Sequence, residues 1–308
     1  MSGPPAQAAV SASPVDLAIG GVSVRVGCAD PDLTLNARGA SRLFLSHGGD
    51  PDVDLTVRRA HLRPAEDGAC VFDSGGVWRL FGEGPTLVFR LYVPHHGNQP
   101  LKEGRISPDF ASGEILFHDE VFPPGAEVDP LDHPLDELVV AGFLATRSGV
   151  ILHACGVSDD KGDGILFSGF SGDGKTTTAQ LWEQLSGVTV LSDDRIIVRP
   201  GTGCGFTMYG TPWHGEARLS STARARLRAI FVLEHGEQNQ LLPIGPVEAA
   251  ALLVARSFPP LFSASGMTSV LGFLASIAAG VPCYRFRFRP DQSAVSVVRA
   301  ALGAIADD

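Results

Sequence analysis

The sequence contains few cysteines, and none is placed to suggest a metal site or a disulfide framework. There are five, with no C-x-x-C pair among them: Cys28, Cys70, Cys155, Cys204 and Cys283. This scatter argues against a zinc site and against a disulfide-stabilised secreted domain. A reducing compartment is the default for such a chain, so we expect a cytoplasmic protein.

Positive charge and long apolar runs are also scarce. The chain has 24 Lys and Arg residues against 34 Asp and Glu residues, a formal net charge of −10. Phosphate backbones and anionic lipids are bound by clustered Lys and Arg, so we expect neither nucleic acid nor a membrane as the main partner. The longest apolar stretch, residues 270–281, is too short to cross a bilayer. The N-terminus also lacks the basic segment and apolar core of a secretory signal.

The 308 residues are 44% hydrophobic, enough to bury a sizeable core in one large or two smaller domains. Residues 1–14 are rich in Ala, Ser and Pro, which predicts a disordered tail. Residues 15–130 carry mostly β signals. Candidate strands, separated by Gly, Pro and Asp clusters, are residues 22–26, 53–57, 77–81, 86–92 and 114–118. Residues 122–132 have the composition of a linker, and we expect a second domain at residues 131–308. The expected fold class is α/β with a mixed sheet.

The stretch that carries recognisable chemistry is GFSGDGKT at residues 169–176. It fits the phosphate-binding pattern G-x-x-x-x-G-K-[ST] at every fixed position. The apolar run at residues 165–168 predicts a strand before it, and residues 176–186 predict a helix after it, with Gly187 as its C-cap. In this arrangement backbone N–H groups and the helix N-terminus bind phosphate oxygens. The predicted nucleotide-binding residues are Gly169, Ser171, Gly172, Asp173, Gly174, Lys175, Thr176 and Thr177.

Within this loop Lys175 is expected to reach the terminal phosphates, and the Thr176 hydroxyl to ligate Mg²⁺. A strand predicted at residues 188–192 ends in Asp193 and Asp194. A carboxylate at the end of a strand next to the loop strand is the second metal-site element of phosphate-loop enzymes. One carboxylate can hold Mg²⁺, and the other can accept a proton from an attacking hydroxyl.

Hairpin pairing predicts a position for His153. If strand 150–157 pairs with the strand that enters the loop so that Val157 faces Gly164, His153 lies opposite Ser168. A histidine beside the terminal phosphates is a candidate for catalysis or for positioning the acceptor. A histidine merely packed in a sheet is the alternative.

The remaining segments predict further regular structure. We expect a strand at residues 229–234. One helix is expected from Pro134 to near Gly149, and three others at residues 247–255, 269–279 and 292–306. Residues 284–289 alternate apolar and basic side chains, which predicts a strand whose basic face is either exposed or binds an acidic substrate. An arginine that contacts the transferred phosphoryl group is expected. The sequence does not distinguish such a role from a solvated face for Arg218, Arg224, Arg226 and Arg228.

Three motifs in order, H-x-x-G-V at residues 153–157, G-x-S-G-x-G-K-T at 169–176 and S-D-D-R at 192–195, resemble the kinase domain of the HPr serine kinase/phosphorylase family. The resemblance covers about residues 131–308 and implies a phosphate-loop fold of the phosphoenolpyruvate carboxykinase type. It also implies ATP and Mg²⁺ as ligands. Carried over, Asp194 is the proton acceptor, Asp193 a metal-side partner and His153 a supporting group.

The chain looks closer to the stand-alone HPr-kinase-like proteins, some of which resemble tailoring kinases encoded beside ribosomal peptide gene clusters. This implies a hydroxyl acceptor on a peptide or protein serine or on a small metabolite. The leading hypothesis is therefore an ATP- and Mg²⁺-dependent kinase. A nucleotide-binding regulator without phosphoryl transfer and a small-molecule carboxykinase-type enzyme are the alternatives, and homo-oligomerisation stays open.

Overall fold

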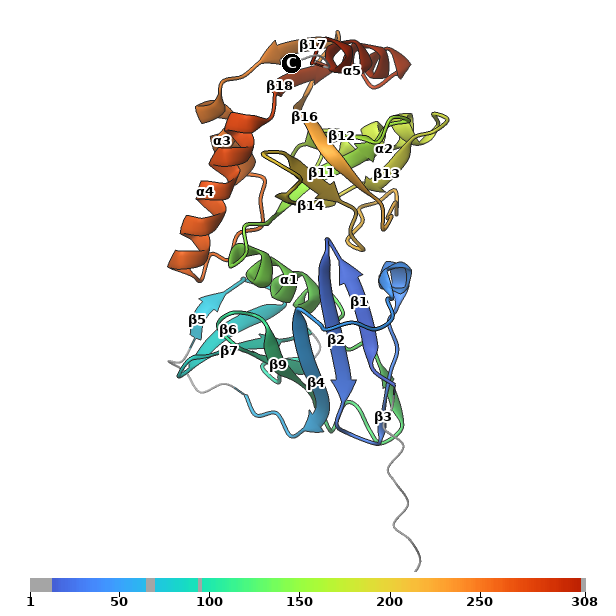
Figure 1. Cartoon of the computed structure of the whole chain (residues 1–308). Coiled ribbons are helices and arrows are strands. Elements are labelled where there is room, and N and C mark those ends of the chain that lie inside the picture. The colour runs from blue at the N-terminus through green and yellow to red at the C-terminus, as the bar shows by residue number, and fades with distance from the viewer. Residues whose placement is uncertain (1–12, 65–69, 94–95, 306–308) are drawn as a thin grey trace, which may run out of the picture. The chain divides into compact units, whose positions relative to one another are not determined.

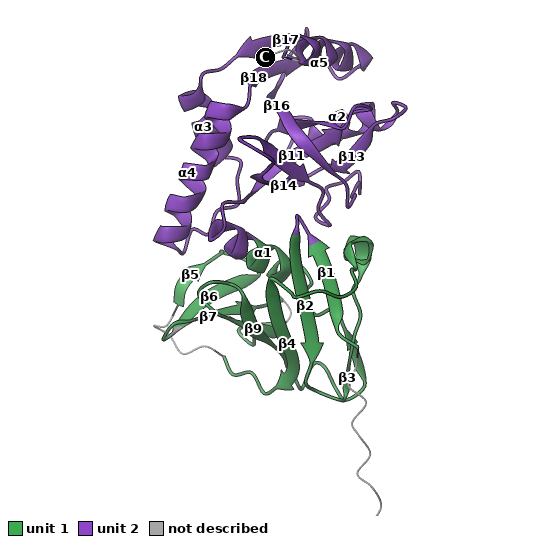
Figure 2. Ribbon diagram, viewed as in Figure 1, with its two compact units in different colours: residues 1–18, 22–140 green, residues 19–21, 141–308 purple. Residues whose placement is uncertain are grey.

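The structure is a computed structural model that describes residues 13–64, 70–93 and 96–305 (Figure 1). Most of the predicted disordered tail, residues 1–12, lies outside the described residues. The chain divides into two compact units, one of residues 1–18 and 22–140 and the other of residues 19–21 and 141–308 (Figure 2). Both units contain mixed arrangements of parallel and antiparallel strands, which confirms the mixed α/β class.

Eight of the described strands form the sheet of the first unit. Their order is β1 (Val15–Ile19), β2 (Val22–Cys28), β4 (Val53–Ala60), β9 (Ser112–His118), β8 (Lys102–Ile106), β7 (Thr86–Leu91), β6 (Trp78–Glu83) and β5 (Cys70–Asp73). Alternate residues of β2 and β4 are fully buried, as their period of two predicts. A short 3-10 helix, η1 (Gly39–Phe44), follows β3 (Leu33–Leu35), which pairs in parallel with β10 (Ala126–Val128).

Five strands of this unit were not predicted: β1, β3, β5, β8 and β10. Strand β8 was missed because its sequence, KEGRI, looks solvent-exposed. Its Lys102 is buried in an ion pair with Asp132, and its buried Glu103 accepts hydrogen bonds from Arg90 and Arg105, each at 2.7 Å. Strand β10 corrects the prediction of a plain linker at residues 122–132.

The second unit is built on β11 (Val150–Ser158), β12 (Asp163–Ser168), β13 (Thr189–Ser192), β14 (Arg195–Pro200), β15 (Phe206–Tyr209), β16 (Arg224–His235), β17 (Gln240–Pro243) and β18 (Cys283–Phe288). Strand β12 pairs antiparallel with β11 and parallel with β16, and β16 pairs in parallel with β18. The carboxyl ends of β12, β16 and β18 therefore meet at one edge. The loop that carries the phosphate-binding motif leaves the sheet at this edge.

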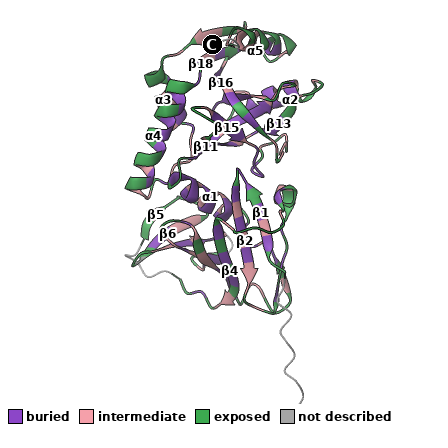
Figure 3. Ribbon diagram, in the orientation of Figure 1, coloured by how far each residue is buried: buried purple, intermediate pink, exposed green. Residues whose placement is uncertain are grey.

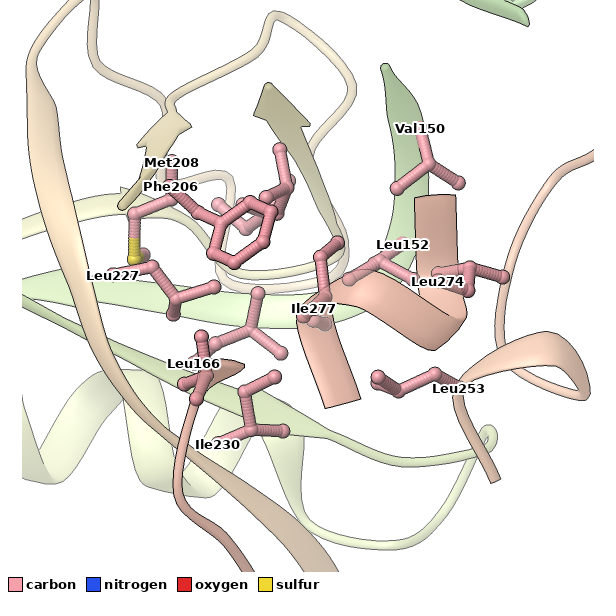
Figure 4. Close-up of a cluster of buried hydrophobic side chains, with 14 of the residues drawn as sticks. Val150, Leu152, Leu166, Phe206, Met208, Leu227, Ile230, Leu253, Leu274 and Ile277 are labelled. Carbon is pink, nitrogen blue, oxygen red and sulfur yellow. The ribbon is translucent and has the colours of Figure 1, made fainter. Parts of the chain in front are cut away.

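Helices cover both faces of this sheet. On one face α2 (Lys175–Glu183) and α5 (Gln292–Ile305) bury Trp182, Phe167, Phe231 and Val298 in a common cluster. On the other face α3 (Pro246–Val254) and α4 (Ala264–Gly280) bury Leu166, Ile230, Leu253 and Ile277 (Figure 4). Leu166 and Phe167, which are successive residues of β12, thus pack into hydrophobic clusters on opposite faces of the sheet. In Figure 3 the buried colour runs through the centre of this sheet. Helix α1 (Leu135–Ala145) precedes β11 and ends earlier than predicted.

The basic face of β18 is neutralised by carboxylates of the same unit. Arg285 contacts Glu234 and Glu248, and Arg287 Nε lies 3.2 Å from Glu234 Oε2. Arg289 pairs with Asp291. These pairs favour a structural role for the alternating strand over the binding of an acidic substrate.

Candidate functional site

The phosphate-binding motif forms a tight connection between a strand and a helix, as its sequence predicts. Strand β12 ends at Ser168 and α2 begins at Lys175, one residue earlier than expected. Gly172 and Gly174 have φ angles of +91° and +99°. Residues with a side chain rarely adopt this left-handed backbone, so glycine is needed at both positions. The first turn of α2 leaves backbone N–H groups free to bind an anion.

The Lys175 side chain lies inside this loop and is only 6% exposed. Its Nζ donates to the carbonyl oxygens of Gly169 and Phe170, both at 3.0 Å, and burial lowers its pKa. The Asp173 carboxylate accepts the Phe170 N–H at 2.6 Å. The loop backbone therefore binds both the ammonium of Lys175 and the carboxylate of Asp173.

His153 and Asp194 meet beside the loop. His153 Nε2 lies 3.0 Å from Asp194 Oδ1, and Arg195 binds the other oxygen of the same carboxylate. Burial acts to raise the pKa of Asp194, but the hydrogen bond from His153 and the charges of Arg195 and Lys175 outweigh it and lower that pKa. Asp194 is therefore ionised at neutral pH.

The hairpin register that led to His153 was wrong by one residue. Ala154, not His153, lies opposite Ser168, while His153 faces Arg195 on β14. The shift comes from the turn, which Asp159 closes by accepting the backbone N–H groups of Lys161 and Asp163 with its carboxylate. A turn fixed by such a side chain sets the register of both strands.

His153 still lies next to the loop, because the His153 carbonyl oxygen accepts the Gly169 N–H at 3.4 Å. Phe258 packs against both His153 and Arg195. Its ring contacts the His153 ring at a centroid distance of 5.9 Å, and the Arg195 guanidinium lies 4.6 Å from its centroid. One aromatic side chain thus packs against both groups that bind the Asp194 carboxylate.

Asp193 is buried, with 1% of its surface exposed. Its two carboxylate oxygens accept the backbone N–H groups of Gly215 and Ala217, at 2.8 and 2.9 Å. Asp193 thereby shapes the loop that carries Glu216, whose side chain is exposed. No sequence motif points to Glu216, because its position depends on these two hydrogen bonds.

A cavity of about 400 Å³ joins these groups. It is lined by His153, Ser171, Gly172, Gly174, Lys175, Thr176, Thr177, Asp194, Gly215 and Glu216. Eight of these ten residues were predicted from the sequence. Three predicted residues do not line it: Gly169 and Asp173 shape the phosphate loop, and Asp193 holds the Glu216 loop. The Thr176 hydroxyl and the Glu216 carboxylate in this lining are oxygen donors, which suit a hard cation such as Mg²⁺.

Arg256 is a further charged residue at the loop that the sequence did not reveal. It follows α3, is 8% exposed and places its guanidinium 4.1 Å from the centroid of the Phe170 ring. Its backbone carbonyl accepts the His153 N–H at 2.7 Å. Its Nη1 donates to Leu252 O at 3.2 Å, whereas its buried Nε has no hydrogen-bond partner among the described residues.

The arginines considered from the sequence lie elsewhere. Arg218, Arg224 and Arg226 are exposed, and Arg228 Nε lies 3.6 Å from Asp163 Oδ1. None of these four lines the cavity. The solvated-face interpretation therefore fits them better than contact with a transferred phosphoryl group.

A scan against protein-family models found no match to this chain, and a search of curated proteins found no similar sequence. Within the described part of the chain, no helix is long and apolar enough to cross a membrane.

Proposed function

We propose that the protein is an ATP- and Mg²⁺-dependent kinase that transfers the γ-phosphoryl group to a hydroxyl. The observation that carries the proposal is the shared cavity: the ionised Asp194, bonded to His153, opens into the same space as Lys175 and Thr176. A site that only binds a nucleotide has no need of a half-buried carboxylate in the cavity beside the phosphate loop.

The chain's own groups fit the two ligands. Gly172 leaves open space where a side chain would stand, since nothing lies within 4 Å of an added β-carbon, so phosphate oxygens can approach its backbone. Lys175 would bind the terminal phosphates, and Thr176 and Glu216 would hold Mg²⁺. When bound, Mg²⁺ supplies charge neutralisation on the phosphoryl oxygens. The sequence-based assignment of Asp193 to the metal stays a prediction, and its buried carboxylate favours Glu216 for direct contact.

Asp194 would orient the acceptor hydroxyl and take up its proton. Its lowered pKa makes it a weak base, which suits a loose phosphoryl-transfer transition state in which the proton leaves late. His153 and Arg195 each bind one oxygen of this carboxylate and thereby fix its orientation. Arg256 does not line the cavity, but its guanidinium stacks on Phe170 of the loop, and from there its charge would act on the phosphoryl group as it moves.

The order of the three sequence motifs supports an HPr-kinase-like fold of the phosphoenolpyruvate carboxykinase type for this unit. The acceptor class that follows is the serine hydroxyl of a peptide or protein, or a hydroxyl of a small metabolite. A regulator that binds ATP without transfer is the rival. One observation favours this regulator: the carbonyl oxygens of Gly169 and Phe170 already bind the Lys175 ammonium.

One assay separates the two functions. The purified full chain is incubated with labelled ATP, Mg²⁺ and the peptides encoded near its gene, and both labelled acceptor and free phosphate are measured. A kinase labels a hydroxyl or, without acceptor, slowly transfers to water. Tight ATP binding with neither product would establish the regulator instead.

A further inference from the structure

Two residues that are partners on neighbouring strands contact the phosphate loop from its outer side. His235 ends β16, Phe288 ends β18, and the two face each other in the parallel pairing of these strands. Strand β16 also pairs in parallel with β12, from which the loop departs. Both residues therefore stand at the edge where the loop begins.

His235 forms a hydrogen bond with the loop backbone. Its Nε2 lies 2.8 Å from the carbonyl oxygen of Gly172, and because a carbonyl can only accept, Nε2 carries the proton. Gly172 is one of the two left-handed residues of the loop. In a planar trans peptide the C=O and the next N–H point in opposite directions. Holding the Gly172 carbonyl outward therefore turns the Asp173 N–H toward the interior of the loop, where it bonds Phe170 O at 3.2 Å.

The other loop glycines rest against the same edge. A β-carbon added to Gly174 would lie 2.5 Å from Phe288 Cζ, so this buried ring touches the glycine backbone. A β-carbon on Gly169 would lie 3.5 Å from Cβ of Leu233, two residues before His235 on the same face of β16. The loop is thus packed at Gly169 and Gly174, and at Gly172 it is held by the hydrogen bond to His235.

We propose that His235 is a positioning residue for nucleotide binding, which keeps the phosphate loop in its receptive shape by hydrogen-bonding the Gly172 carbonyl from outside. The proposal rests on the proposed function, because it assigns the loop to a nucleoside triphosphate. His235 does not line the cavity, so it acts on the loop and not on the transferred group. Its loss therefore weakens nucleotide binding and leaves the transfer step of the bound complex unchanged.

The test compares His235→Leu, which lacks a donor, with His235→Gln, whose amide can donate to the same carbonyl. His47→Leu, at an exposed histidine of the other unit, is the control. The Kd for ATP with Mg²⁺ is measured by calorimetry, and KM and kcat by the transfer assay. Loss of one such hydrogen bond predicts a rise in Kd and KM of roughly three- to tenfold for His235→Leu, with kcat unchanged. His235→Gln and His47→Leu retain the wild-type values.

Hydrogen exchange of residues 169–175 without nucleotide gives a readout that does not depend on ATP. Exchange is faster in His235→Leu and unchanged in His235→Gln. If the wild type binds no ATP, the proposed function fails, and the exchange result still decides the role of His235. Wild-type exchange in His235→Leu, or a His235→Gln variant as impaired as His235→Leu, would overturn the proposal. Should His235→Leu fail to fold, His235→Asn, whose amide is too short to reach Gly172, takes its place.

Discussion

His153 Nε2 lies 3.0 Å from Asp194 Oδ1, although 41 positions separate the two residues in the chain. The contact is made by the pairing of β11 with β14, which sets His153 opposite Arg195. Strand β11 also pairs with β12, so the same histidine touches the start of the phosphate loop through its carbonyl. A carboxylate and a phosphate-binding loop are brought to one cavity by three adjacent strands.

Arg256→Met removes the buried positive charge that stacks on Phe170. We expect phosphoryl transfer to fall by roughly a hundredfold or more, because a preorganised cation stabilises the charge that develops during transfer. Arg256→Lys should not restore the rate, since an ammonium loses the planar stacking of the guanidinium. The matched control is the exposed Arg226→Met. Equal turnover of Arg256→Met and Arg226→Met would remove Arg256 from the site.

The two left-handed glycines of the loop are predicted to differ in their tolerance of alanine. Gly172→Ala meets open space and costs only the backbone penalty, about 1–2 kcal/mol. Gly174→Ala has the same penalty and also places a methyl group 2.5 Å from Phe288 Cζ, which adds about 1–3 kcal/mol of overpacking. Thermal unfolding of the two variants measures the difference. Equal stability losses would contradict the contact between Phe288 and the loop.

Asp173→Asn is expected to strengthen nucleotide binding. The amide oxygen can still accept the Phe170 N–H, while the negative charge beside the phosphates is removed. The Kd for ATP should fall roughly two- to tenfold, and the gain should shrink as salt screens the charge. Binding weaker than wild type in the folded variant would mean that the carboxylate itself contributes, for example by holding the cation.

The phosphate-binding loop and Asp194 could be predicted because they belong to local sequence motifs. His153 could be predicted from the pairing of two neighbouring strands. The pairing of β11 with β12 was predicted one residue out of register, because the Asp159 carboxylate in the turn determines which residues face each other. Glu216 could not be predicted, because it reaches the cavity on a loop held by Asp193. Arg256 could not be predicted either, because the segment after α3 brings it to Phe170 of the phosphate loop. Strand β8 was missed for a different reason, because Lys102 and Glu103 are buried as ion pairs with residues distant in the chain.

Asp194 should also make stability depend on pH. Its pKa is lowered in the folded protein, so the unfolded chain takes up the proton more readily in acid. The stabilisation is present above the ordinary pKa of aspartate, about 3.9, and is lost as the pH falls through the folded value. Urea unfolding of the wild type and of Asp194→Asn should therefore differ most near neutral pH and converge below about pH 4. A difference that widens in acid would contradict the assigned ion contacts.

Phosphoryl transfer by the wild type and by Asp194→Asn, measured beside ATP binding, tests the central claim most directly. The account predicts that the wild type labels a hydroxyl acceptor. The variant should bind ATP normally and transfer more slowly by roughly two to four powers of ten, because only the proton-accepting carboxylate is lost. Undiminished transfer by Asp194→Asn would contradict the assignment of Asp194, and ATP binding by the wild type with no transfer to any acceptor or to water would contradict the kinase itself.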